Sequence, residues 1–153
     1  MPELRLSMVG DGSERETMER LAAEMGIAGQ ATFRGQQLDV APSFSASDAF
    51  IMSSRSEGLP ISLLQAFSLG LPAIVTDVGG MAEVVRLTQA GFMVSAPDPA
   101  EMAAAILQMA WSEAMPAEFS ANAKAAFQLG FSLTRRLFGS MLRRMEALPL
   151  PAG

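Results

Sequence analysis

The sequence contains neither cysteine nor histidine. Disulfide bonds are therefore excluded, and so are metal sites that depend on cysteine or histidine ligands. Nucleophilic catalysis that relies on a histidine base is excluded for the same reason. Any chemistry must rest on carboxylates, amides, basic side chains and main-chain donors.

Long apolar runs and excess positive charge are also missing. No run reaches the ~18 residues of a membrane span, and the N-terminus lacks the basic-then-apolar pattern of a signal peptide. We therefore expect a cytoplasmic chain. The net charge of -5 argues against nucleic acid as a partner. With 153 residues, half of them hydrophobic, the chain suits one globular domain with a buried core.

Predicted strands alternate with predicted helices along the chain. The expected strands are Leu4–Val9, Ala31–Arg34, Ala49–Ser53, Ala73–Thr76 and Phe92–Val94. This alternation predicts an α/β fold, a Rossmann-like and mainly parallel sheet with helices on both faces, followed by a helical C-terminus. We expect a domain over residues 1–148 and a loose tail over 149–153.

Several helix ends can be predicted from their residues. Ser13 and Glu16 form the pattern of a capping box, which predicts a helix that ends before Gly26. Asp98-Pro99-Ala100-Glu101 opens another helix with a cap, a proline and an early acid. Beyond Trp111 the pattern predicts helices over residues 117–128 and 133–147.

Three loops rich in glycine, serine and aspartate follow predicted strands, namely Gly10–Ser13, Ser54–Pro60 and Asp77–Gly80. Since ligands of such sheets bind at the carboxyl ends of the strands, these loops are the candidate site. Gly10-Asp11-Gly12 is interpreted as a structural turn. A dinucleotide site would need a third glycine where the chain has Arg15, and an acid where it has Arg34-Gly35.

The segment from Ser54 to Pro60 is more informative. It leads directly into a helix, with Pro60 at the expected first position, so the free amides of the first turn favour a phosphate. Gly58 permits close approach to the main chain. Glu57 suits sugar hydroxyls as an acceptor, but it could equally offset the helix dipole.

Two further features leave alternatives open. Gln65 lies two turns into that helix and would either face the ligand or face solvent. Gly79-Gly80 could be a simple turn or a second close approach to the ligand.

Taken together, the motifs resemble the second domain of group 1 (family 4) glycosyltransferases of the GT-B fold. The resemblance covers nearly the whole chain. It rests on the order and spacing of Val9–Gly12, Phe33–Gly35, Ser53–Pro60, Leu64–Ala66, Gly70–Pro72 and Asp77–Glu83.

The resemblance implies roles for particular residues. Glu57 corresponds to the first glutamate of the family's Glu-seven-residues-Glu motif, a catalytic-site residue that contacts and orients the donor sugar. The main chain at Gly58, Leu59 and Pro60 would contact sugar hydroxyls, and the amides of Ile61 and Ser62 would face the diphosphate. Gln65 takes the place of the second glutamate, which binds the ribose, and the segment around Arg34 resembles the part that contacts the base.

The chain departs from the family pattern in two ways. Gln65 can make only a neutral hydrogen bond, which is weaker than a charge-assisted one. The family's acceptor domain, and a strand-helix unit with an arginine and a lysine for the diphosphate, would precede Leu4. The family's strand order would put that strand between Leu4–Val9 and Ala49–Ser53. We therefore expect a domain incomplete at its N-terminus: a fragment, a truncated frame or half of a split protein.

The expected parent activity is a retaining hexosyltransferase of polysaccharide biosynthesis. It would move a sugar from a nucleoside diphosphate sugar to a sugar or lipid-linked acceptor, without metal or cofactor and by mainly electrostatic catalysis. This chain alone is expected to be inactive, and peripheral membrane association of the parent enzyme stays open. The alternative is a non-catalytic remnant or subunit that binds nucleotide-sugar weakly or pairs with another chain. A third reading, a GT-B epimerase, is disfavoured by the Ser56–Pro60 segment.

Overall fold

The computed structural model describes residues 3–95 and 98–128 of the chain. Its strands are β1 (Leu6–Met8), β2 (Ala31–Phe33), β3 (Phe50–Met52), β4 (Ala73–Thr76) and β5 (Gly91–Val94). Its helices are α1 (Arg15–Glu24), α2 (Ala41–Ser45), α3 (Ile61–Ser68), α4 (Gly79–Thr88) and α5 (Pro99–Trp111). Residues 115–128 are also helical. Each expected strand is therefore present, and so is the expected helix up to residue 128, while the helix expected over 133–147 and the tail lie outside the described residues.

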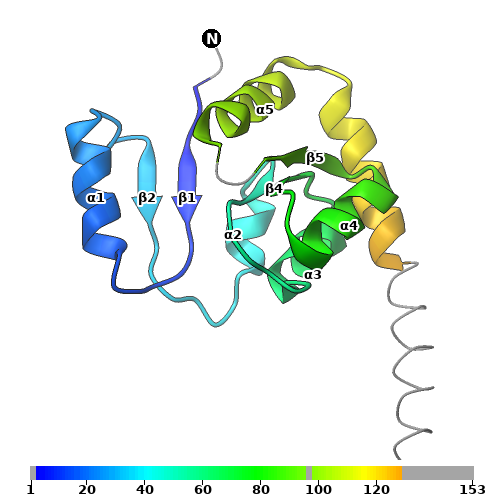
Figure 1. Ribbon diagram of the computed structural model, residues 1–153, viewed down its shortest axis with the longest axis horizontal. Coiled ribbons are helices and arrows are strands. Elements are labelled where there is room, and N and C mark those ends of the chain that lie inside the picture. The colour runs from blue at the N-terminus through cyan, green and yellow to red at the C-terminus, as the bar shows by residue number, and fades with distance from the viewer. Residues whose placement is uncertain (1–2, 96–97, 129–153) are drawn as a thin grey trace, which may run out of the picture.

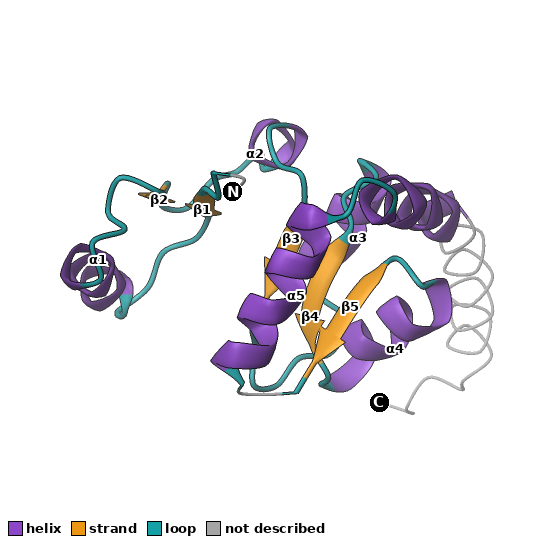
Figure 2. Cartoon of the chain, turned by 90° about the horizontal axis from the view of Figure 1, so that it is seen from above, coloured by secondary structure: helices purple, strands orange, loops and turns teal. Residues whose placement is uncertain are grey.

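The strands are parallel, but they form two sheets. β1 pairs with β2, and β3, β4 and β5 form a second sheet in that order. Figure 2 shows β1, β2 and α1 standing to one side of the second sheet. We call residues 3–35 the amino-terminal unit and residues 49–128 the packed unit. The interruption lies between β1 and β3, where the family's strand order predicts it.

The packed unit has helices on both faces of its sheet, as the alternation predicted. In Figure 1 the sheet is seen nearly edge-on, with α5 above it and α3 and α4 below. Alternate residues of the fully buried strand β4 serve the two layers. Ala73 and Val75 pack with Leu63 and Phe67 of α3 and with residues of α4, whereas Ile74 packs against α5. Burial on both faces explains why apolar and polar residues do not alternate in the sequence of β4.

The first strand of the amino-terminal unit has no buried face, although apolar and polar residues alternate along Leu4–Val9. All three residues of β1 are exposed, and the exposed fraction of the side chains is 44% at Leu6 and 38% at Met8. The strand has β2 on one side only, and no described strand pairs with its other edge. A cavity of about 230 Å³ lies between the amino-terminal unit and the elements β3 and α5, and it is lined by Leu4, Arg5, Leu6, Ile27, Gln30, Ala31, Ile51 and Ile106.

Two predicted helix starts need correction. α1 begins at Arg15 with Glu14 as N-cap and has no side-chain cap, so the capping box of Ser13 and Glu16 does not form. Pro60 is the N-cap of α3 in extended conformation rather than its first helical residue. In contrast, Asp98 caps α5 as predicted and accepts hydrogen bonds from the amides of Ala100 at 2.9 Å and Glu101 at 3.0 Å. Within the described residues, no helix is long and apolar enough to cross a membrane.

Candidate functional site

The loop Ser54–Pro60 connects β3 to α3, as the sequence predicted. It lies beside the loop that follows β4, because the two strands are parallel neighbours. The carboxyl ends of β3 and β4 thus bring together two of the three predicted loops. The third loop, Gly10–Ser13, follows β1 in the other sheet.

The first turn of α3 is open to a ligand. No side chain caps it, which leaves the main-chain amides of Ile61 and Ser62 without a capping acceptor. Ile61 is 73% exposed, so solvent reaches this helix end. The amides and the positive end of the helix dipole together favour an anion at this position. α5 serves as an internal comparison, because Asp98 already occupies its first-turn amides.

Glu57 lies at the mouth of this turn and is half-buried. The hydroxyl of Ser54 donates a hydrogen bond of 3.0 Å to Oε1 of Glu57. Among the described residues this is the one polar contact found for the Glu57 carboxylate, so Oε2 remains able to accept. The side chain therefore has a fixed local partner and an acceptor left for a ligand hydroxyl.

The pair Gly79-Gly80 opens α4 against the same loop. A Cβ on Gly79 would lie 1.7 Å from the carbonyl oxygen of Glu57, and one on Gly80 would lie 3.0 Å from that of Gly58. Gly79 also has a φ of +55°, which favours glycine. The close approach that these glycines permit is therefore to the main chain of the Glu57 loop.

Gln65 is exposed on α3 and lines a cavity of about 220 Å³. The other residues around this cavity are Leu38, Asp39, Val40, Ala41, Phe44, Ser68 and Leu69. Leu38 is fully exposed. Gln65 thus faces a hollow between α3 and the segment that leads into α2, and Glu57 is not among the residues that line it.

Arg34 lies apart from these residues. It follows β2, and its Nε donates a hydrogen bond of 2.7 Å to the hydroxyl of Ser7 on β1. The structure therefore brings Glu57, Gly58 and the start of α3 together in one place, whereas Arg34 belongs to the amino-terminal unit and is hydrogen-bonded within it.

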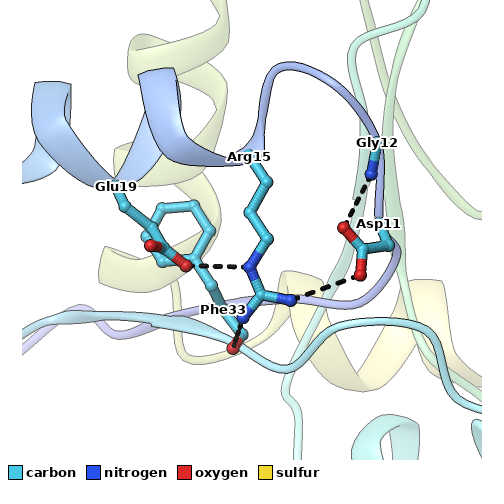
Figure 3. Close-up of polar contacts among 5 residues, drawn as sticks. All are labelled: Asp11, Gly12, Arg15, Glu19 and Phe33. Atoms are coloured by element: carbon cyan, nitrogen blue, oxygen red, sulfur yellow. Dashed lines mark hydrogen bonds and ion pairs between the residues drawn. The ribbon is translucent and has the colours of Figure 1, made fainter.

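The carboxylate of Asp11 accepts a hydrogen bond of 2.9 Å from the amide of Gly12 and pairs with Arg15 of α1, which agrees with a structural turn at Gly10–Gly12 (Figure 3). The guanidinium of Arg15 pairs with Glu19 at 2.9 Å and with Asp11 at 3.5 Å, and it donates to the carbonyl of Phe33 at 3.2 Å. The hydrogen bond to Glu19, followed by the charges of Glu19 and Asp11, raises the pKa of Arg15 above its ordinary value. Arg15 is therefore charged at any physiological pH and ties α1 to the end of β2.

Sequence reasoning missed Thr76 as a site residue. It ends β4, is 3% exposed, and donates a hydrogen bond of 2.5 Å to the carbonyl oxygen of Ser54. A hydroxyl at the end of an otherwise apolar buried strand was the available signal, but its partner lies 22 residues away in the sequence. In the part of the chain that the structure describes, no group of three or more acidic residues could hold a metal ion.

Comparison with known proteins gives a consistent result. Residues 1–126 match the family described as "Glycosyl transferases group 1". The lipopolysaccharide core biosynthesis glycosyltransferase LpsE of Rhizobium meliloti is 35% identical over 109 residues, which are 71% of this chain and 32% of LpsE. The putative glycosyltransferase EpsD of Bacillus subtilis is 32% identical over 109 residues, which are 71% of this chain and 29% of EpsD. The chain thus spans about a third of the length of these relatives.

Solved structures show the same fold. Sucrose-phosphate synthase from Thermosynechococcus elongatus matches with a TM-score of 0.81 and 26% identity, over 95% of this chain and 39% of that one. HepE from Anabaena, solved in complex with UDP-glucose, matches with a TM-score of 0.84 and 20% identity, over 94% of this chain and 42% of that one. On the match of residues 1–126, the chain belongs to the group 1 glycosyl transferases.

Proposed function

We propose that this chain is the donor-binding part of a retaining glycosyltransferase, which moves a hexose from a nucleoside diphosphate sugar to a sugar or lipid-linked acceptor. The observation that carries the proposal is the open first turn of α3 directly after Glu57. A diphosphate would accept hydrogen bonds from the amides of Ile61 and Ser62, and the helix dipole would favour its charge.

The sugar would lie over the preceding loop. Oε2 of Glu57 and the main chain at Gly58, Leu59 and Pro60 would bind its hydroxyls, and Glu57 would orient the sugar rather than attack it. Catalysis would then be electrostatic, through stabilisation of the departing diphosphate, without a metal or a cofactor. The complex of HepE with UDP-glucose, at the level of a shared fold, supports this class of ligand.

The nucleoside would lie further along α3. Gln65 lines a cavity of about 220 Å³. Its side-chain amide oxygen would be a neutral acceptor for the ribose hydroxyls. Arg34 is proposed near the base, although in the unliganded chain it is hydrogen-bonded to Ser7. The proposal places the reaction in the cytoplasm and assigns acceptor binding to a part of the enzyme that lies outside this sequence.

A second candidate is a non-catalytic subunit that binds nucleotide-sugar weakly. The interruption of the sheet between β1 and β3 favours it, and so does the neutral Gln65 in place of a glutamate. The two candidates share the donor site and differ in whether sugar is transferred.

Calorimetry of the chain with UDP and GDP tests the donor site. We expect dissociation constants no better than about 1 mM, because the resemblance implies that the arginine and lysine which hold the diphosphate belong to a segment before Leu4. Micromolar binding would contradict the importance given to that basic pair. Absence of binding to either nucleotide at about 10 mM would contradict the donor site itself.

A further inference from the structure

The loop that carries Glu57 is held from outside by β4 and α4. Contacts at its beginning and at its end come from residues 20 or more positions later in the chain. The proposed function gives no role to those residues.

In addition to these contacts from outside, a first contact within the loop holds the carboxylate. Ser54 donates to Oε1 of Glu57 at 3.0 Å, and both side chains are half-buried. A hydrogen bond between residues three positions apart restricts the side chain of Glu57 to the rotamers that keep Oε1 near Ser54.

The second contact holds Ser54 itself. The hydroxyl of Thr76 donates to the carbonyl oxygen of Ser54 at 2.5 Å. Thr76 is 3% exposed and lies at the end of a strand that is buried on both faces. The packed core therefore fixes the position of Thr76, and the hydrogen bond from Thr76 restricts the main chain of Ser54.

The third contact limits the main chain of Glu57. Because Gly79 has no side chain, the carbonyl oxygen of Glu57 can lie where a Cβ would be 1.7 Å away. Gly80 permits a similar approach of the Gly58 carbonyl. α4 therefore serves as a support for the far end of the loop.

We propose that Ser54, Thr76 and Gly79 are positioning residues, which set the direction of the Glu57 carboxylate for the donor sugar. The identity of the ligand rests on the proposed function, whereas the restriction of Glu57 exists in the unliganded chain. The two can therefore be tested separately.

The first experiment measures the rotamer of Glu57 without ligand, from three-bond NMR couplings about its χ1. We expect one rotamer in the parent chain and in Thr76→Ser, which keeps the hydroxyl. We expect averaged couplings in Ser54→Ala and in Thr76→Val, which has the shape of threonine without its hydroxyl. Ser54→Ala leaves the core untouched, so its result stands even if Thr76→Val does not fold. A single Glu57 rotamer in Ser54→Ala would overturn the proposal.

The second experiment compares UDP-glucose with UDP in chemical-shift titrations of the same variants. Ser54→Ala and Thr76→Val should bind UDP-glucose about three- to tenfold more weakly and UDP with unchanged affinity, since the diphosphate contacts α3 and only the sugar needs Glu57. Thr76→Ser should retain the parent ratio. An equal loss for both ligands would show a merely structural role and overturn the proposal.

Gly79→Ala tests the support by α4, with Gly29→Ala as control, because a Cβ on Gly29 meets nothing within 4 Å. We expect displaced amide resonances in Gly58 and Leu59 for Gly79→Ala and none for the control. Unchanged resonances in Gly79→Ala would remove Gly79 from the set. If the parent chain binds neither ligand, the proposed function fails, and the χ1 couplings still decide the role of Ser54 and Thr76.

Discussion

The amino-terminal unit and the packed unit have similar chain patterns but differ in packing. Each has parallel strands connected by a helix. The buried apolar residues of the described chain nevertheless lie almost entirely in α2 and the packed unit, and Ala22 is the one such residue in the amino-terminal unit. Six large apolar side chains of that unit are instead exposed, namely Leu4, Leu6, Met8, Met18, Leu21 and Met25.

The difference teaches that strand residues are buried by the elements that cover the strand's edges and faces. β4 has β3 and β5 beside it and helices on both faces, whereas β1 has β2 alone. The proposed donor site lies on the packed unit, with Glu57, Thr76 and the first turn of α3 around its central strand. The positions of these groups are therefore set by the better-packed part of the chain.

Leucine truncation should reveal the largest contrast between the two units. Leu63→Ala removes a fully buried side chain and should lower the free energy of unfolding by about 2–5 kcal/mol. Leu6→Ala removes a side chain that is 44% exposed and should cost less than about 1 kcal/mol. Urea unfolding, followed by circular dichroism and by the fluorescence of Trp111 in α5, measures both. Equal losses would contradict the comparison.

Amide hydrogen exchange should show the same contrast in the unaltered chain. We expect the amides of β4 to exchange at least about a hundredfold more slowly than those of β1, because the few buried contacts of β1 permit local opening. Exchange followed by NMR or mass spectrometry measures this ratio. Similar protection of the two strands would indicate that the units unfold together.

Helix caps give a smaller and more local contrast. Asp98→Ala removes two hydrogen bonds to the first turn of α5 and should destabilise the chain by about 1 kcal/mol. Ser13→Ala is the matched control, because Ser13 does not cap α1, and it should change stability by less than about 0.5 kcal/mol. Thermal unfolding of the two variants decides between this account and a capping box formed in solution.

An effect of similar size to that of the helix cap concerns ligand binding on the packed unit. Gln65→Glu should tighten UDP binding by around 1 kcal/mol, or about fivefold, because a charge-assisted bond to the ribose replaces a neutral one. Gln108→Glu on α5 adds the same charge away from the site and should leave the affinity unchanged. Calorimetry of both variants measures this, and an unchanged affinity in Gln65→Glu would remove Gln65 from the site.

Local patterns in the sequence predicted much of this architecture. Asp98 followed by proline and an early acid predicted the start of α5, and the apolar run Ala73–Thr76 coincides with β4. The same reasoning was wrong at Ser13, where the pattern of a capping box is present but α1 begins after Glu14 without a side-chain cap. Such patterns show that a residue is able to cap a helix. Whether it does so depends on the conformation of the surrounding chain.

The contacts between distant residues could not be predicted in this way. The loop Ser54–Pro60 was identified because its residues are contiguous. The hydrogen bond from Thr76 to Ser54 and the fit of Gly79 against Glu57 arise from the pairing of β3 with β4. The exposure of β1 could not be predicted for the same reason. Alternation of apolar and polar residues in Leu4–Val9 shows that the strand could bury one face, but it does not show whether another element packs against that face.

A titration of the isotope-labelled chain with UDP-glucose, followed residue by residue in amide NMR spectra, tests the donor site most directly. The account predicts that the largest shifts occur at Gly58, Ile61 and Ser62, and that Ala100 in the capped first turn of α5 does not move. Shifts confined to the amino-terminal unit, or equal shifts at Ala100 and Ser62, would contradict a donor site at the open end of α3.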